Sequence, residues 1–218
     1  SVVIDDGRHF LLTSDRMYDA ITADPFDPWT RGAASLSTLE FYQLARKHLN
    51  PGGVITVWLP LYENNEAAVR SEIATFLQAF PNGVVWGNTN QGQGYDLVLS
   101  GTVGDAPIDV ELLAERLGRP EYAPVAQSLM EIGFPSLEAF LGTFAGRGPE
   151  LAPWVSGAEI NRDRNLRLQY LAGLGLNSYD QDVIYQAMLG YRRWPEGLFV
   201  GSPERLGAII NQMGGVAP

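Results

Sequence analysis

The alternation of short apolar runs with amphipathic segments over the first hundred residues constrains the fold of this chain more than any other feature. Short apolar runs predict buried strands, and apolar residues repeated every three or four positions predict helices. The predicted order is strand, strand, helix, strand, helix, strand, strand, with elements at residues 2–4, 18–24, 41–49, 54–59, 69–80, 84–86 and 96–99. This order is typical of an α/β fold with a mainly parallel sheet, and the last two strands, joined without a helix, predict an antiparallel edge.

The character of the sequence changes near residue 105. Before it, the helix at 41–49 follows a capping-box signature that runs from Ser37 to Glu40. After it, helical pieces separated by proline and glycine follow at residues 110–117, 125–132, 137–144 and 179–191. We therefore predict an α/β domain over residues 1–105 and a helical appendage, without a sheet of its own, over residues 106–218.

Charge and composition exclude several classes of partner and site. The chain carries 25 Asp and Glu against 15 Lys and Arg, a net charge of −10 that repels nucleic acid and anionic lipid surfaces. It has no cysteine and two histidines, which excludes disulfides and cysteine-based or histidine-rich metal sites, so we expect no metal. The longest nearly unbroken apolar run, 54–59, is far shorter than the roughly 20 residues that a membrane-spanning helix needs.

Carboxylates are expected at the strand ends, where ligands bind in open α/β sheets. Asp24 and Asp27 lie three residues apart after the strand at 18–24, and each is next to a proline. Two such acids suit the binding of an amine and the acceptance of its proton, although Asp-Pro pairs also form ordinary turns. Asp6 is equally ambiguous, because it can contact an adenine or ribose group or cap the turn at residues 8–12.

Four ordered motifs resemble those of spermidine synthases. They occupy residues 3–11, 18–28, 36–42, and 49–54 followed by 58–62. The resemblance is strongest to the spermidine synthase-like branch that is often fused behind a membrane-spanning region. A later stretch with Asn161 and Asp163, at residues 160–170, is similar to an Asn-Thr-Asp and Leu-Glu-Tyr motif of that branch.

The resemblance implies a Rossmann-like methyltransferase fold, of which residues 1–105 form the C-terminal half. It also implies a transferase of polyamine biosynthesis, which moves an aminopropyl group from decarboxylated S-adenosylmethionine to an amine such as putrescine. The roles carried over by motif are the catalytic acid/base for Asp24, amine binding for Asp27, and the nucleotide side of the site for Asp6, Gly7 and Leu36. Trp58 and Tyr62 are expected in the wall of the substrate pocket.

The sequence also departs from the family. The glycine-rich loop and the acidic strand end that hold the nucleotide have no counterpart, so we expect the chain to begin after them. The diamine-binding Gln and Glu of the family fall near Val57, Trp58 and Pro60. Three functions therefore stay open: an incomplete aminopropyltransferase, a non-catalytic interaction module that keeps the fold, and an S-adenosylmethionine-dependent methyltransferase.

The setting of the chain follows from the same resemblance. It implies a cytoplasmic location and allows a membrane domain upstream of Ser1. We expect an uncovered central strand edge to be masked by dimerisation or by the helical appendage, and we expect a homo-oligomer. A second glycine-rich stretch, residues 173–178, imitates a dinucleotide loop, but Ser178 replaces its third glycine, and a plain turn is the simpler interpretation.

Overall fold

The computed structural model describes residues 2–25, 27–90 and 92–215. Phe26, which lies between the two acids of the predicted site, falls outside these ranges. The chain forms two compact units, one made of residues 1–105 and 145–191 and the other of residues 106–144 and 192–218. The boundary at residue 105 matches the change in sequence character, whereas residues 145–191, expected in the appendage, are part of the first unit.

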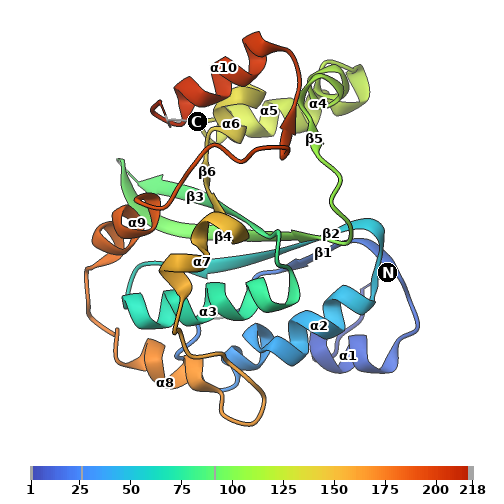
Figure 1. Cartoon of the computed structure of the whole chain (residues 1–218). Helices are drawn as coiled ribbons and strands as arrows, with labels where there is room; N and C mark the ends of the chain where they lie inside the picture. The colour runs from blue at the N-terminus through green and yellow to red at the C-terminus, as the bar shows by residue number, and fades with distance from the viewer. Residues whose placement is uncertain (1, 26, 91, 216–218) are drawn as a thin grey trace. The chain divides into compact units, whose positions relative to one another are not determined.

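The first unit is built on a five-stranded sheet with the strand order β1-β2-β4-β3-β6 (Figure 1). Its strands are β1 (Tyr18–Ala23), β2 (Leu49–Pro60), β3 (Val84–Asn90), β4 (Gln93–Thr102) and β6 (Phe144–Arg147). β1 pairs with β2 in parallel, and β4 pairs with both β2 and β3 in antiparallel orientation. It follows that β1, β2 and β3 run in one direction, with β4 reversed between β2 and β3.

This arrangement confirms the α/β class and the antiparallel pairing of the last two predicted strands. The prediction of a mainly parallel sheet with that pair at its edge was wrong, because β4 lies inside the sheet and makes two antiparallel ladders. The chain returns directly from β3, so β4 pairs antiparallel with β3 and fills the position beside β2. The strand predicted at residues 2–4 was also wrong, since Val2 and Ile4 are 92% and 99% exposed and belong to no strand.

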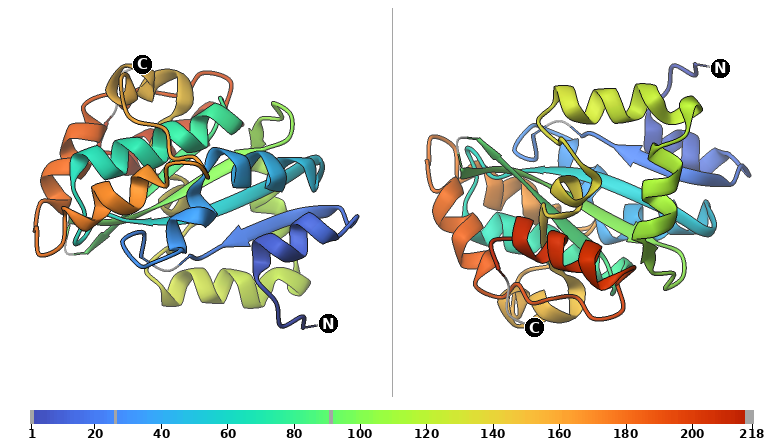
Figure 2. Two further views of the ribbon diagram at one scale, coloured as in Figure 1. Left: turned by 90° about the horizontal axis from the view of Figure 1, so that it is seen from below. Right: turned by 90° about the horizontal axis from the view of Figure 1, so that it is seen from above.

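The helices of the first unit follow the apolar periodicity where the prediction covered them. They are α1 (Gly7–Thr13), α2 (Leu39–Lys47), α3 (Glu66–Ala79), α7 (Gly148–Val155), α8 (Arg167–Gly173) and α9 (Gln181–Leu189), with a short 3-10 helix η1 at Ala33–Ser37. Seen from below, α2, α3 and α8 lie in front of the sheet (Figure 2). The core is formed on this face, where Ile55, Val57 and Leu59 alternate along β2 and are fully buried.

The start of α2 differs in detail from the predicted capping box. Thr38, and not Ser37, is the N-cap, and its hydroxyl accepts a hydrogen bond from the Phe41 amide at 3.2 Å. Ser37 is instead buried and donates its hydroxyl to Glu72 Oε1 at 2.7 Å. The cap is therefore displaced by one residue, because Ser37 is used to satisfy a buried carboxyl group.

The second unit is mostly helical. It contains α4 (Val110–Leu117), η2 (Pro120–Tyr122), α5 (Ala123–Glu131), α6 (Leu137–Leu141) and α10 (Pro203–Gln212). A two-stranded parallel sheet pairs β5 (Ile108–Asp109) with β7 (Phe199–Val200), so the expectation of a unit without a sheet of its own was wrong. The two strands are short and about 90 residues apart in the sequence, so local periodicity does not indicate their pairing. Across the described ranges of both units, no helix combines the length and the apolar character needed to cross a bilayer.

Candidate active site

A cavity of about 390 Å³ lies alongside β1. Three predicted site residues line it from three separate segments: Gly7 at the start of α1, Asp24 just after β1, and Leu36 in η1. The remaining lining residues are mostly apolar and comprise Phe10, Leu11, Tyr18, Ala20, Ile21, Thr22, Ala23, Pro25 and Phe41. The pocket is thus mostly apolar with one carboxylate in its lining, which suits a flat ring joined to a charged group.

Asp6 performs the capping role that the sequence allowed. It is the N-cap of α1, and its Oδ1 accepts a hydrogen bond from the His9 amide at 2.8 Å. α1 has seven residues and begins where the sequence suggested a turn. Gly7 lines the pocket, whereas Asp6, which precedes it, is not among the lining residues. Contact of Asp6 with a nucleotide remains a prediction.

The two acids after β1 differ in exposure. Asp24 is exposed, while Asp27 is half-buried and precedes the buried Pro28. Burial raises the pKa of the Tyr62 hydroxyl, and the negative charge of Asp27 raises that pKa further. Asp27 and Tyr62, both predicted on the substrate side, therefore lie close enough to interact electrostatically.

Tyr62 belongs to an aromatic group at the ends of β2 and β4. Its ring centroid is 4.9 Å from that of Tyr95 and 6.1 Å from that of Trp58. The Trp58 indole N–H donates a hydrogen bond to Asp96 Oδ2 at 3.0 Å, and the Leu61 amide donates to the Tyr95 carbonyl at 3.1 Å. These contacts place Trp58 and Tyr62 together, beside two residues that the sequence did not suggest.

Tyr95 and Asp96 are the residues that sequence reasoning missed. Asp96 stands opposite Pro60 in the ladder between β2 and β4, and its negative charge also raises the pKa of Tyr62. The available signal was the acid itself, since Asp96 directly precedes the apolar run Leu97–Leu99 and is buried in the structure. Trp58, Tyr62 and Asp27 are not among the residues that line the cavity beside β1. Aromatic faces and carboxylates are nevertheless the groups that attract an organic cation.

Two other site types receive no support from the described residues. No group of three or more His, Cys, Asp and Glu side chains within them is placed to hold a metal ion. In the glycine-rich stretch at 173–178, the backbone of Asn64 and Asn65 lies against Gly175, and Ser178 donates its hydroxyl to the Asn64 carbonyl at 2.7 Å. The stretch is therefore a packed turn and not a dinucleotide loop.

Comparison with known proteins agrees with the sequence motifs. Residues 1–84 match the family model of the spermine/spermidine synthase domain. A probable polyamine aminopropyl transferase of Bifidobacterium longum is 33% identical over 79 residues, which cover 36% of this chain and 18% of that protein. Polyamine aminopropyltransferase 1 of Pseudomonas aeruginosa is 32% identical over 109 residues, which cover 42% of this chain and 37% of that protein.

These matches are partial. The chain spans between 18% and 37% of the length of the two curated relatives. A solved structure of a probable spermidine synthase from Corynebacterium glutamicum is similar with a TM-score of 0.49 and 20% identity, over 74% of this chain and 53% of that one. Residues 1–84, which match the family model, include all four motifs and hence both acids after β1.

Proposed function

Because this chain is spermidine synthase-like over its first 84 residues, we propose that the pocket beside β1 is the donor side of an aminopropyltransferase site. The observation that carries the proposal is the convergence of Gly7, Asp24 and Leu36 on one apolar pocket. The donor is decarboxylated S-adenosylmethionine, with its adenine between Gly7 and Leu36 and its sulfonium directed toward Asp24.

The reaction is a displacement at carbon. The nitrogen of the acceptor amine attacks the carbon of the aminopropyl group that is bonded to sulfur, the C–S bond breaks, and methylthioadenosine leaves. The amine loses one proton, which the Asp24 carboxylate accepts. Positioning the two substrates and removing that proton are most of what the protein must supply.

The acceptor side is formed by Asp27 together with the aromatic group. The faces of Trp58, Tyr62 and Tyr95 attract an ammonium group, and the carboxylates of Asp27 and Asp96 balance its charge. This combination takes the place of the diamine-binding Gln and Glu of the family. The acceptor class is therefore a small organic cation, of which putrescine is the first to test.

The test is a two-donor assay on the longest natural form of the protein that contains this chain. Incubation with decarboxylated S-adenosylmethionine and putrescine is expected to yield spermidine and methylthioadenosine in equal amounts. Incubation with S-adenosylmethionine and the same amine is expected to yield no methylated amine. Methyl transfer with no aminopropyl transfer would move the chain to the methyltransferase class, and inertness toward both donors contradicts an enzymatic role.

A second candidate function, protein interaction on the same scaffold, is favoured by one surface. Large apolar side chains are exposed over α8, α9 and the segment between them, namely Tyr170, Leu174, Leu176, Tyr179 and Val183, with exposures between 43% and 83%. Exposed apolar patches of this kind are common at contact surfaces. Replacement of Leu174 and Tyr179 by serine, followed by light scattering, tests whether this surface associates with another chain.

A further inference from the structure

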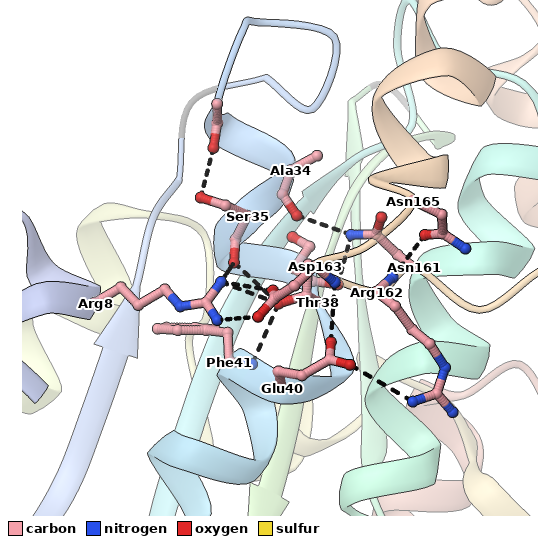
Figure 3. A network of polar contacts seen from close by, with 12 residues as sticks. Arg8, Ala34, Ser35, Thr38, Glu40, Phe41, Asn161, Arg162, Asp163 and Asn165 are labelled. Atoms are coloured by element: carbon pink, nitrogen blue, oxygen red, sulfur yellow. Dashed lines mark hydrogen bonds and ion pairs between the residues drawn. The ribbon is translucent and has the colours of Figure 1, made fainter. Parts of the chain in front are cut away.

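The segment between α7 and α8 is bound to two distant parts of the first unit (Figure 3). Arg8, in α1, forms a bidentate ion pair with Asp163: Nη1 donates to Oδ1 at 2.7 Å, and Nη2 donates to Oδ2. The two residues are 155 positions apart in the sequence. A planar guanidinium that bonds a carboxylate through both nitrogens fixes orientation as well as distance.

The same guanidinium also contacts the segment that precedes α2. Nη1 of Arg8 donates to the Ser35 carbonyl at 3.1 Å and approaches Thr38 Oγ1 at 3.4 Å. On the other side, the Asp163 amide donates to Glu40 Oε2 at 3.1 Å. Arg8 and Asp163 therefore link α1, η1 and the first turn of α2.

Asn161 anchors this loop in the interior. Its side chain is fully buried, and its Nδ2 donates to the carbonyls of Ala34 at 2.8 Å and Ser37 at 3.0 Å. Its Oδ1 accepts from the Leu168 amide at 3.1 Å. Asn161 thus holds η1 directly, so the position of Asp163 relative to η1 is fixed from within.

The residues that form these hydrogen bonds are sequence neighbours of residues that line the pocket. Arg8 follows Gly7 in α1, and Leu36 lies between Ser35 and Ser37 in η1. Gly7 and Leu36 both line the cavity beside β1. A helix as short as α1 is not stable in isolation, so its placement against η1 depends on contacts such as this ion pair.

We propose that Arg8 and Asp163 are positioning residues for the donor nucleotide, which set the separation of α1 and η1 and hence the fit of the pocket between them. The inference rests on the proposed function and adds to it a role for a loop far away in the sequence. Neither side chain needs to touch the nucleotide. Loss of the pair is expected to loosen α1, and so to weaken donor binding without changing the chemistry at Asp24.

The test compares Asp163→Asn and Arg8→Lys with Glu115→Gln, which breaks an exposed Arg119–Glu115 pair of 2.7 Å in the second unit. For Asp163→Asn we expect the KM of decarboxylated S-adenosylmethionine to rise about tenfold, with kcat and the KM of the amine within twofold of the original protein. Arg8→Lys, which keeps the positive charge but cannot form the bidentate pair, is expected to raise the donor KM less than Asp163→Asn does. An unchanged donor KM, or an equal rise in both KM values, overturns the inference.

Hydrogen exchange provides a readout that does not depend on turnover. The Phe10 amide bonds the Asp6 carbonyl at 2.8 Å within α1, and its exchange is expected to accelerate about tenfold in Asp163→Asn and not in Glu115→Gln. If the original protein transfers nothing, the proposed function fails, while unchanged exchange at Phe10 still overturns the positioning role. A change in exchange together with an unchanged donor KM also counts against it, because α1 would then move without affecting the pocket.

Discussion

Two polar regions of the first unit differ in how their charges and hydrogen bonds are satisfied. Around Asn161 and Asp163, buried or partly buried groups are paired with partners from distant segments. At the end of β1, by contrast, the side-chain carboxylates of Asp24 and Asp27 have no hydrogen-bond or ion-pair partner among the described residues. Buried structural polar groups are normally satisfied within the protein, so the carboxylates of Asp24 and Asp27, which are not used in this way, are candidates for ligand contact.

The largest effect expected from this comparison is on catalysis. Asp24→Asn keeps the size of the side chain and removes the charge that would accept the amine proton, so turnover should fall by about 10²- to 10⁴-fold. Because Asp24 is exposed and unpaired, the thermal midpoint should stay within about a degree or two. Asp15→Asn, an exposed acid of the same unit, is the control for both measurements. A large drop in midpoint with intact transfer would make Asp24 a turn residue.

The opposite outcome is expected at Asn161. Asn161→Ala leaves the buried Ala34 and Ser37 carbonyls and the Leu168 amide without their partner. Since each of the three stranded buried groups costs about 1–3 kcal/mol, we expect a loss of roughly 3 kcal/mol or more in the free energy of unfolding. Urea unfolding followed by tryptophan fluorescence measures it.

The matched control for that experiment is Asn165→Ala. Asn165 lies in the same loop but is exposed, so water can replace its contacts, and the expected loss is below about 1 kcal/mol. Equal losses for the two variants would show that the interior anchor is no more important than the surface of the loop.

A third test concerns Glu72, a buried acid whose carboxylate is only partly hydrogen-bonded. Glu72 accepts a hydrogen bond from Ser37 through Oε1, whereas its Oε2 has no hydrogen-bond partner among the described residues. Burial raises the pKa of Glu72 from 4.5 to about 7. The folded state therefore holds this proton more tightly than the unfolded state, so the contribution of Glu72 to stability is full below pH 4.5 and is lost as pH rises to about 7.

The corresponding measurement compares urea unfolding at pH 5 and pH 8. The raised pKa of Glu72 corresponds to a loss of at most about 3 kcal/mol in the free energy of unfolding between pH 5 and pH 8. Glu72→Gln stays neutral at both pH values and should remove this part of the pH dependence. The free energy of unfolding of the variant, relative to that of the original protein, should therefore be higher at pH 8 than at pH 5. Glu121→Gln, an exposed acid, is the control and should keep the original difference. A pH dependence that is identical in the Glu72 variant contradicts a raised pKa.

Local patterns predicted the parts of this fold that depend on neighbours in the sequence. The apolar periodicity of residues 69–80 predicted α3, and the run at 18–24 predicted β1, after which the candidate acids Asp24 and Asp27 follow. Residues 2–4 have the same apolar character as a strand, but they are exposed in the structure, which periodicity cannot reveal. The position of β4 between β2 and β3 was missed, because strand order depends on pairing between strands that are distant in the sequence.

The parts of the site that could not be predicted depend on contacts between distant residues. Nothing near Arg8 in the sequence indicates Asp163 as its partner, and nothing near Trp58 indicates Asp96. The similarity of residues 160–170 to a family motif marked the loop as notable, but only the hydrogen bonds of Asn161 show what it holds. The sequence therefore suggested the acids of the candidate site, and the structure was needed for the groups that surround them.

The smallest effect expected is at Asp27, and it sharpens the contrast between the two acids of the site. Asp27→Asn removes a charge that would hold the acceptor amine, so the KM of the amine should rise roughly tenfold while kcat changes little. The same change removes a negative charge near Tyr62 and should lower the pKa of that hydroxyl, which ultraviolet titration of the variant can measure. Asp15→Asn again serves as the control. A lower Tyr62 pKa with an unchanged amine KM would keep the geometry and reject the acceptor role, because Asp27 would then be near the aromatic group without contributing to binding.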